Sequence, residues 1–478
     1  MSSSQKNNRR SFIKKSATAA IGISIIPRHV MGQGFIPPSD KLNIAVIGGG
    51  GKGYSDAVNA WNKGASNITA ICDVDWNSAS KAFKKFPKAK KYKDFRKLFD
   101  QVKDFDAVTV STPDHTHAVI TMAAIKMGKH VYVQKPLTHN IYEARMLTKA
   151  ANEYKIVSQM GNQGASGLGV KQMIEWFDEG KIGAVNKVDI WTNRPIWPQG
   201  IPTKTDKPEI LDGLDWDTWI GPAEMVDYHP QYHPFKWRGW WNFGTGALGD
   251  MGCHLIDPPY RVLGLGYPTE VESSVGAVFI KDWSPEHLPD SCPPSSRTQL
   301  TFKASDKNPV DTKITWTDGG LRPFHPDLIP ADHPLGSHNS ANGVIMYGEK
   351  GIMTCGTYGV DPKIYLNSGE VLKSKIKEKT APDNGHQAKW VEACKAGFNS
   401  NKHKNLTSSF DFAGPLTESI LMGNLAIRSY NLREKRDNNR FDYPGRKKLL
   451  WDGANMRITN FDQANQFVQR EYRKGWSL

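Results

Sequence analysis

A short apolar run that leads directly into a cluster of glycines limits the fold of this chain more than any other feature. Residues 43–47 read Asn-Ile-Ala-Val-Ile, and residues 48–53 follow at once as Gly-Gly-Gly-Gly-Lys-Gly. Such a run is typical of a parallel strand that is buried on both faces. Residues 54–61 then carry apolar side chains at positions i, i+3, i+4 and i+7, which predicts an amphipathic helix. The segment therefore predicts a strand, a tight turn and a helix.

The glycines of this turn have the G-x-G-x-x-G spacing of a dinucleotide-binding loop. Gly48 permits the tight turn, Gly50 lets the backbone approach a pyrophosphate, and Gly53 lets the helix pack closely on the strand. A second strand is predicted at 68–72 and ends at Asp73, about twenty residues after the last glycine. A carboxylate there accepts hydrogen bonds from ribose hydroxyls and repels a 2′-phosphate, so NAD is the expected cofactor.

Three further predicted strands, at 106–111, 130–134 and 156–160, each end in polar residues. Because the carboxyl ends of parallel strands meet at one edge of a sheet, we expect these residues to border the ligand. Residues 41–160 are thus predicted to form a Rossmann domain with a doubly wound parallel sheet. The candidate cofactor-binding residues are Gly48, Gly50, Gly53, Asp73, Thr112, Pro113, His117, Gln134, Lys135 and Asn162.

The first residues resemble an export signal. Arg9 and Arg10 precede Phe12 and a weakly apolar stretch at 16–27, which resembles a twin-arginine signal. Residues 1–35 are therefore expected to be a signal and linker, and the protein is expected in the periplasm. A basic amphipathic helix is the alternative. Twin-arginine export moves folded proteins, so the cofactor would be loaded before export.

Composition excludes several classes of protein. The net charge is +14, but beyond the basic first 39 residues the charges of both signs are interspersed, which argues against nucleic acid as a partner. No apolar run reaches the roughly 18 residues of a membrane span. The 5 cysteines are scattered, so neither a disulfide scaffold nor a zinc site is expected. Prolines directly follow His229 and His233, which argues against a helical metal pair.

The second half, residues 161–478, has more predicted strands than helices. We expect an α+β domain with a largely antiparallel open sheet, one face of which is covered by helices. The other face would need a partner, so a homo-oligomer, either a dimer or a tetramer, is expected. Two loops rich in proline, at 282–297 and 318–342, are expected to be lids over a cleft. Strands are predicted at 185–192, 270–280, 297–303, 312–317, 343–347 and 363–366, and helices at 170–179, 386–396 and 412–432.

Together these motifs resemble the glucose–fructose oxidoreductase, inositol dehydrogenase and MocA superfamily (Gfo/Idh/MocA), over residues 41–300. The resemblance implies an α/β chain with a Rossmann domain and a C-terminal α/β domain, bound NAD(P), and a sugar or polyol substrate. Residues 161–163, 191–195 and 471–476 look like a bacterial, often exported subgroup. Gln134 departs from the family, which commonly has Glu before Lys-Pro. The motifs that carry the resemblance are Gly48-x-Gly50-x-x-Gly53, Asp73, Thr112-Pro113-x-x-x-His117, Lys135-Pro136 and Asp250-Met-Gly-Cys-His254.

The candidate catalytic residues are Lys135, Asp250 and His254. Oxidation of a secondary alcohol needs a base for the hydroxyl proton, and His254 is the candidate because imidazole titrates near neutral pH. Asp250 precedes it by four positions, on the same face of a predicted helix, where it would orient His254 or bind a substrate hydroxyl. Lys135 would polarise the substrate oxygen. On spacing alone, a capped helix and a surface lysine explain these residues, and the resemblance favours catalysis. Pro258 and Pro259 are expected to limit the helix to little more than one turn.

The stretch 216–241 is rich in aromatic residues, which either pack under a long loop or stack on the C–H faces of a sugar. Trp237 and Arg238 are the sharpest pair, because an arginine binds hydroxyls through its planar fork. Arg194 lies in a loop after a predicted strand and is a further candidate. The candidate substrate residues are therefore Arg194, Trp237 and Arg238, with Asp250 and His254.

Three functions fit these residues. The first is an NAD-dependent oxidoreductase that removes a hydride from a ring hydroxyl of a sugar, polyol or glycoside. The second is an NAD-dependent glycoside hydrolase of the same superfamily, with transient oxidation at C3, elimination and no net redox. The third, a sugar- or nucleotide-binding protein without catalysis, is disfavoured because Lys135, Asp250 and His254 are all present.

Overall fold

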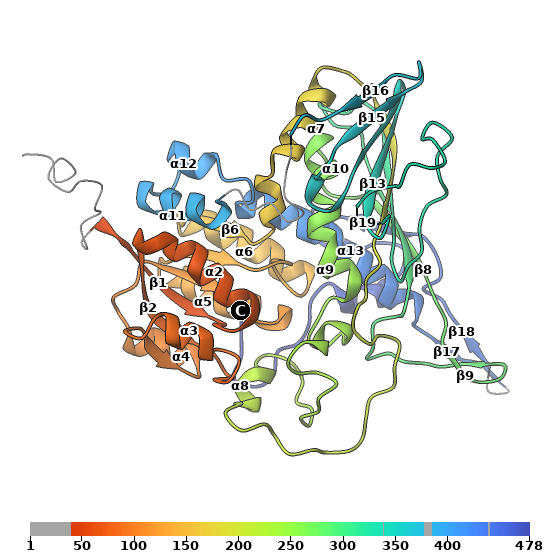
Figure 1. The fold of residues 1–478 in the computed structure, drawn as a ribbon. Coiled ribbons are helices and arrows are strands. Elements are labelled where there is room, and N and C mark those ends of the chain that lie inside the picture. The colour runs from red at the N-terminus through yellow and green to blue at the C-terminus, as the bar shows by residue number, and fades with distance from the viewer. Residues whose placement is uncertain (1–39, 338, 377–384, 438–439) are drawn as a thin grey trace, which may run out of the picture. The chain divides into compact units, whose positions relative to one another are not determined.

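A computed structural model describes residues 40–337, 339–376, 385–437 and 440–478 of the chain (Figure 1). The chain divides into two compact units, residues 1–41 and Leu42–Leu478. Only Asp40 and Lys41 of the first unit are described, so the signal expected at residues 1–35 lies outside the described residues. Among the described residues, no helix is both long and apolar enough to cross a membrane.

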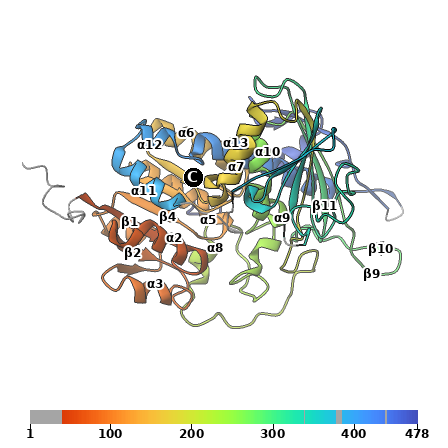
Figure 2. The same ribbon diagram turned by 45° about the horizontal axis from the view of Figure 1, so that its top comes forward.

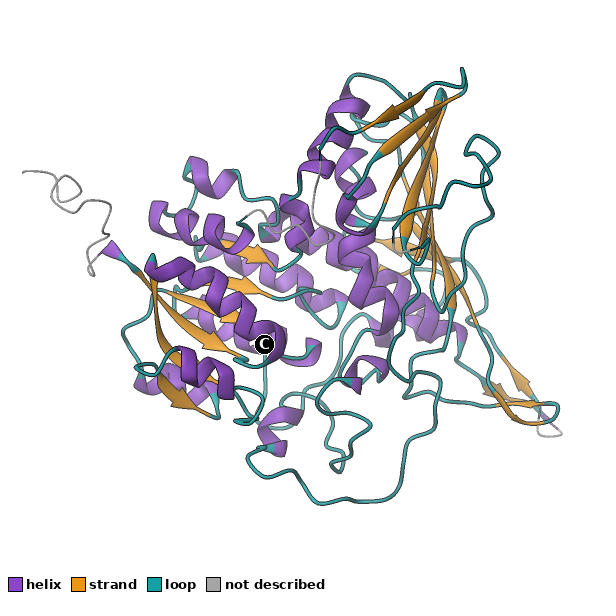
Figure 3. Cartoon of the chain, in the orientation of Figure 1, coloured by secondary structure: helices purple, strands orange, loops and turns teal. Residues whose placement is uncertain are grey.

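The first half of the second unit contains a six-stranded parallel sheet in the order β3-β2-β1-β4-β5-β6. This order is typical of dinucleotide-binding domains and confirms the predicted Rossmann fold. Helices flank the sheet (Figure 3). The strands are β1 (Leu42–Ile47), β2 (Ser66–Cys72), β3 (Lys90–Tyr92), β4 (Ala107–Val110), β5 (His130–Val133) and β6 (Ser158–Met160). The helices are α2 (Gly51–Trp61), α3 (Ser80–Lys85), α4 (Phe95–Gln101), α5 (Asp114–Lys126) and α6 (Ile141–Glu153).

Burial explains the central strands. In β1 every residue except Asn43 is buried, and all of β4 is buried, as an apolar run between two helical layers requires. The helix α5 begins at Asp114, directly after Pro113. Pro113 has an extended backbone at the N-cap, a position at which the missing N–H of proline costs no helical hydrogen bond.

The second half contains a ten-stranded mixed sheet, in the order β16-β15-β14-β13-β7-β12-β11-β8-β19-β20. Only the β7–β12 pair is parallel among its neighbours, so the expectation of a largely antiparallel sheet is confirmed. The strands of this half are β7 (Val185–Trp191), β8 (Glu270–Val275), β9 (Phe279–Lys281), β10 (Ser284–Pro285), β11 (Ser296–Phe302), β12 (Thr312–Thr317), β13 (Gly343–Gly348), β14 (Gly351–Cys355), β15 (Lys363–Leu366), β16 (Val371–Lys373), β17 (Glu434–Lys435), β18 (Phe441–Asp442), β19 (Leu449–Asp452) and β20 (Arg457–Ile458).

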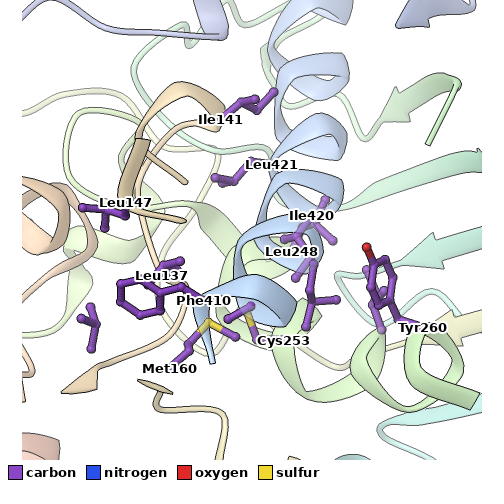
Figure 4. Packing of buried hydrophobic residues seen from close by; sticks show 14 of the residues in the cluster. Leu137, Ile141, Leu147, Met160, Leu248, Cys253, Tyr260, Phe410, Ile420 and Leu421 are labelled. Atoms are coloured by element: carbon purple, nitrogen blue, oxygen red, sulfur yellow. The ribbon is translucent and has the colours of Figure 1, made fainter. Parts of the chain in front are cut away.

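One long helix, α13, ties the two sheets together. It packs on α6 of the Rossmann domain and also on α9, β8 and β11 of the second half. Figure 4 shows Ile420 and Leu421 of α13 between Ile141 of α6 and Leu248 of α9, in one continuous buried cluster. The helices of this half are α7 (Leu168–Asp178), α8 (Trp216–Ile220), α9 (Gly246–Leu255), α10 (Asp257–Val262), α11 (His386–Ala396), α12 (Asn401–Lys404) and α13 (Phe410–Tyr430).

The helix that carries Asp250 and His254 is longer than expected. It begins at Gly246, and Pro258 and Pro259 lie in the first turn of the next helix, α10. Proline is tolerated there because the first N–H groups of a helix have no partner within it. The prolines therefore open a second helix, and the expectation that they leave little more than one turn was wrong.

Segments late in the chain return to the Rossmann domain. The helix α11 packs on α2, and Trp390 of α11 lies 5.6 Å from the ring of Tyr132 in β5. Figures 1 and 2 both show α11 and α12 beside α2. Near the C-terminus, Arg470 and Tyr472 both bind Glu143 of α6. The cofactor domain is thus completed by residues far from it in sequence.

The two predicted lids lie elsewhere. Residues of 318–328 line a cavity of about 1070 Å³ on the face of the ten-stranded sheet that carries Arg297, Gln299 and Lys313. Neither 282–297 nor 318–342 contributes a described residue to the cleft beside the glycine loop. Instead, the segment between β7 and α9, which is mostly loop (Figures 1 and 3), lines that cleft with residues such as Trp197 and Phe235.

Candidate active site

One cleft of about 740 Å³ joins the predicted cofactor and catalytic residues. The carboxyl ends of β1, β2, β4 and β5 form one wall, as expected for a doubly wound sheet. The helix α9 and the loop between β7 and α9 form the other. The residues predicted from sequence that line it are Gly48, Gly50, Asp73, Thr112, Pro113, Gln134, Lys135, Arg194, Trp237, Arg238, Asp250 and His254.

The glycine loop follows a tight backbone path that only glycines permit. A Cβ on Gly53 would overlap the carbonyl oxygen of Gly48, and a Cβ on Gly50 would lie 2.9 Å from the Cβ of Ser78. Gly50 is the N-cap of α2 and offers no side chain to the free N–H groups of its first turn. Such a helix end binds phosphate. The loop therefore fits the pyrophosphate of NAD.

Asp73 lies at the end of β2, beside the loop. Its carboxylate accepts hydrogen bonds from the backbone N–H groups of Gly50 and Asp75, at 2.9 Å each. Burial raises its pKa to about 6, although the two backbone bonds act in the opposite direction. Because each oxygen keeps a further lone pair and the residue lines the cleft, Asp73 fits a ribose hydroxyl.

Sequence reasoning missed Asp56, a fully buried carboxylate in α2. It forms an ion pair with Lys52 and accepts hydrogen bonds from Ser111 and Gln134, at 3.0 and 2.8 Å. Gln387 of α11 donates a further bond at 3.0 Å. This explains Gln134: a glutamate there would place two carboxylates together, which costs free energy.

Besides Gly53, two predicted cofactor residues do not line the cleft. The ring nitrogens of His117 lie 2.8 Å from the carbonyl oxygens of Thr112 and of Pro136, so His117 links two strand ends from behind. The fully buried Asn162 donates to Asp257 of α10 at 3.3 Å, and its neighbour Gln163 lines the cleft instead. His117 and Asn162 therefore influence the shape of the cleft only through the residues that they contact.

An ion pair connects the catalytic candidates across the cleft. The Nζ of Lys135 lies 2.7 Å from both the Oδ1 and the backbone carbonyl oxygen of Asp250. Arg238 and Arg194 lie 3.5 and 3.8 Å from the same carboxylate. Burial raises the pKa of Asp250, but the charges of Lys135 and Arg238 outweigh it and hold this pKa below its usual range. Asp250 is therefore an anion that orients cations.

His254 lies one turn further along α9 and lines the same cleft. Burial and the charge of Lys135 lower its pKa well below the ordinary value, so the ring is neutral at physiological pH. Its Nδ1 is buried and has no hydrogen-bond partner among the described residues. The ring of Tyr358 contacts it edge-on at 4.6 Å. A neutral imidazole in this position can accept a proton.

Tyr358 is a second residue that sequence reasoning missed. It follows β14, which no pattern in the sequence predicts, and its backbone has a positive φ of 67°, which is uncommon outside glycine. A Cβ on Gly164 would lie 2.8 Å from the ring, so this glycine makes room for it. The conformation directs the ring toward His254 and the cleft.

The aromatic stretch divides into core and cleft. Trp216 is buried and stacks on Trp219 at 4.6 Å, as the packing alternative predicts, and Trp219 is buried but also lines the cleft. The guanidinium of Arg238 lies over the rings of Trp237 and Phe235, at 4.2 and 4.8 Å, and all three line the cleft. Among the described residues, no cluster of histidine, cysteine and acidic side chains could hold a metal ion.

Comparison with known proteins agrees with this geometry. Residues 42–162 match the model of the Gfo/Idh/MocA oxidoreductase family, NAD-binding Rossmann fold, and residues 176–280 match the C-terminal alpha/beta domain of that oxidoreductase family. The first domain is therefore an NAD-binding Rossmann domain.

Two curated relatives and one solved structure illustrate the similarity. A levoglucosan dehydrogenase of Pseudarthrobacter phenanthrenivorans is 27% identical over 296 residues, 59% of this chain and 66% of the relative. A glycosyl hydrolase family 109 protein of Solibacter usitatus is 33% identical over 153 residues, 29% of this chain and 35% of the relative. The matches thus span about two thirds and one third of these relatives. An inositol dehydrogenase homolog of Azotobacter vinelandii, solved with NADH and myo-inositol, has a TM-score of 0.55 at 15% identity, over 81% of this chain and 95% of that chain.

The position of Asp73 predicts its role in cofactor choice. Asp73→Ala should weaken binding of NAD and reduce the preference for NAD over NADP, because the ribose acceptor and the repelling charge are lost together. Dissociation constants for both cofactors, measured by fluorescence titration of the nucleotide-free protein, test this. Asp100→Ala, which changes an exposed carboxylate, is the control. An unchanged ratio of the two constants in Asp73→Ala would exclude this role.

The ion pair predicts which variants act together. Lys135→Met and His254→Ala should each reduce turnover by about 10² or more, the scale of general acid–base catalysis. Asp250→Asn should reduce it as well, but should add little in the Lys135→Met background because Asp250 holds the Nζ of Lys135.

Turnover is measured on a substrate that the wild type accepts, and Lys149→Met, on the exposed surface of α6, is the control. NAD binding should persist in His254→Ala. Near-normal turnover of His254→Ala on every accepted substrate would show that another group is the base.

Proposed function

We propose that this chain, two segments of which match domain models of the Gfo/Idh/MocA oxidoreductase family, is an NAD-dependent dehydrogenase that oxidises a ring hydroxyl of a sugar, polyol or glycoside. One observation carries this proposal. A single cleft contains the glycine loop, Asp73 and the Lys135–Asp250 pair, with His254 one helical turn from that pair. A binding protein without catalysis has no need of a buried ion pair beside a neutral histidine at this position.

The glycine loop and Asp73 would hold NAD, which would supply the acceptor for the hydride of the substrate carbon. The chain's own residues then have three tasks: they stabilise the reacting oxygen, accept the hydroxyl proton and position the substrate. Lys135, held by Asp250, donates a hydrogen bond to the reacting oxygen and stabilises negative charge on it. His254, neutral because of burial and of Lys135, accepts the hydroxyl proton at Nε2, since its Nδ1 is buried.

The substrate is positioned by the far side of the cleft. The forks of Arg194 and Arg238 both lie beside Asp250 and suit neighbouring hydroxyls of a sugar ring. Ile196 and Phe235 line the cleft although they are 60% and 43% exposed, which is unusual for large apolar side chains. Together with Trp237 they offer an apolar surface to the C–H face of a sugar or to an apolar aglycone.

A redox-neutral glycoside hydrolase is the second candidate, supported by the similarity to the family 109 protein over 153 residues. In that case oxidation at C3 acidifies the C2 proton, the aglycone leaves by elimination, water adds and the hydride returns. The same cleft residues would serve the oxidation step, so the two candidates differ in the products released.

Incubation of the NAD-loaded protein with matched p-nitrophenyl and methyl glycosides separates the candidates. We expect a ketoglycoside and an equivalent of NADH from both members of a pair, because oxidation does not depend on the leaving group. Release of p-nitrophenol without net NADH would instead select the hydrolase. Lys135→Met is the control for background chemistry. If no sugar or polyol that is tried gives either product, both candidate functions are contradicted.

We propose further that the chain is exported in a folded state by the twin-arginine route and acts in the periplasm. The support is the pair Arg9-Arg10 followed by Phe12. The periplasm offers no nicotinamide pool, so the cofactor must stay bound. Trp219 and Trp476 line the same cleft as Asp73 and offer large apolar surfaces to a bound cofactor.

Cell fractionation tests this proposal. The periplasmic protein should release about one equivalent of NAD on denaturation, and Arg9→Lys with Arg10→Lys should leave the protein in the cytoplasm. Lys14→Arg with Lys15→Arg, which changes the neighbouring basic pair as conservatively, should be exported normally. A periplasmic protein that contains NADP or no nucleotide would contradict the proposal.

A further inference from the structure

A second cavity, of about 80 Å³, is lined by a set of residues that does not overlap with the lining of the cleft. It is bordered by the start of α6, the residues just before α9, one face of α13 and the segment 466–470. We call it the rear cavity. The polar residues that line it are His139, Asn140, Thr245, Asn424, Arg428, Gln466, Gln469 and Arg470.

Two arginines line the rear cavity, and the charge of one of them, Arg428, is not balanced by a described carboxylate. Arg428 of α13 lies over the rings of Phe467 and Trp241, at 4.1 and 5.7 Å, and no described carboxylate is within ion-pair distance of it. Burial without a counter-charge lowers its pKa to about 10, so the guanidinium remains charged at neutral pH. Arg470 uses Nε and Nη2 for Glu143 and the carbonyl oxygen of His115, and its buried Nη1 has no partner among the described residues.

Two buried amides have one group each that lacks a partner. Asn140 accepts a hydrogen bond from the N–H of Glu143 at 3.0 Å, which fixes its Oδ1 and leaves Nδ2 unpaired. Asn424 donates to the carbonyl oxygen of Thr245 at 2.8 Å, which leaves Oδ1 unpaired. Both side chains are 6% exposed. An unpaired buried polar group costs free energy, so a ligand that satisfies these groups would be bound.

We propose that the rear cavity is a binding site for a small protonated oxyanion, such as hydrogen phosphate. The donors of Arg428, Arg470 and Asn140 suit oxygen atoms that carry negative charge. The ring nitrogens of His139 are also unpaired among the described residues, and a neutral ring offers one donor and one acceptor. The unpaired acceptors, which include Oδ1 of Asn424, need a donor, which a protonated oxygen supplies and fully ionised sulfate lacks. The volume fits a few atoms and excludes a nucleotide or a sugar.

The site is connected to the catalytic helix. Thr245 is the N-cap residue of α9, its carbonyl oxygen accepts from Asn424, and its Oγ1 donates to Asp114 at 2.6 Å. An anion that orders Asn424 therefore also orders the start of the helix that carries Asp250 and His254. Occupancy should steady α9 without any contact with the substrate.

The test uses the NAD-loaded protein, so that the phosphate site of the glycine loop is already filled. Calorimetric titration at constant ionic strength should show that inorganic phosphate binds at least about tenfold more tightly than sulfate. Arg428→Gln should weaken phosphate binding by about tenfold or more, because it removes the unpaired charge. Arg322→Gln, on the exposed surface, should leave it unchanged.

Because Arg428→Gln can also disturb packing, Asn424→Asp provides an independent variant of nearly the same size. Its carboxylate should repel the anion and weaken phosphate binding to a similar extent, whereas Asn401→Asp, on the surface of α12, should not. Circular dichroism verifies that each variant is folded. Hydrogen exchange of residues 244–255 should slow with phosphate in the wild type but not in these two variants.

Phosphate could also enter the cleft, beside its arginines, and Arg238→Gln distinguishes that source. The proposal requires phosphate binding to survive Arg238→Gln and to fail in folded Arg428→Gln and Asn424→Asp. If binding is instead lost in Arg238→Gln and kept in the other two, the anion occupies the cleft and the proposal is overturned. Absence of phosphate binding to the wild type overturns it as well. Neither result bears on the dehydrogenase proposal.

Discussion

The ion pair between Lys135 and Asp250 is the contact on which the active site depends. It joins the end of β5 in the Rossmann domain to α9 in the second domain, at 2.7 Å, and both side chains are about 15% exposed. Loss of one partner of a buried pair costs about 3–5 kcal/mol, because the other charge is left uncompensated. The pair therefore fixes the distance between the cofactor loop and His254 and determines where the reacting oxygen can lie.

The local motifs of the site could be predicted because each depends on a short stretch of chain. Gly48, Gly50 and Gly53 report the shape of one turn, and the four-residue interval between Asp250 and His254 is set by the pitch of a helix. Strand ends at one sheet edge brought Lys135 into the same cleft. The same repeated strand–helix pattern predicted five of the six strands of the parallel sheet, and the short edge strand β3 was missed.

Other parts of the site depend on contacts between distant segments, and no local pattern reports these. Asp56 accepts a hydrogen bond from Gln387, which lies in a helix more than 300 residues later in the chain. Tyr358 reaches His254 through an unusual backbone conformation after an unpredicted strand. His117 and Asn162 matched a family motif, but the motif does not show whether each residue lines the cleft or lies behind the residues that line it. The predicted lids were wrong for the same reason, because a loop's composition does not reveal what it covers.

The position of α13 has a consequence for how ligands enter and leave. A helix that packs on α6 and on β8 at once, with Ile420 and Leu421 buried between the two domains, acts as a strut. Rotation of one domain against the other would expose that cluster, so the cleft cannot open by a hinge without a large loss of buried apolar area. A movement of the loop between β7 and α9, which lines the cleft, would change access to the site while α13 keeps the two domains in place.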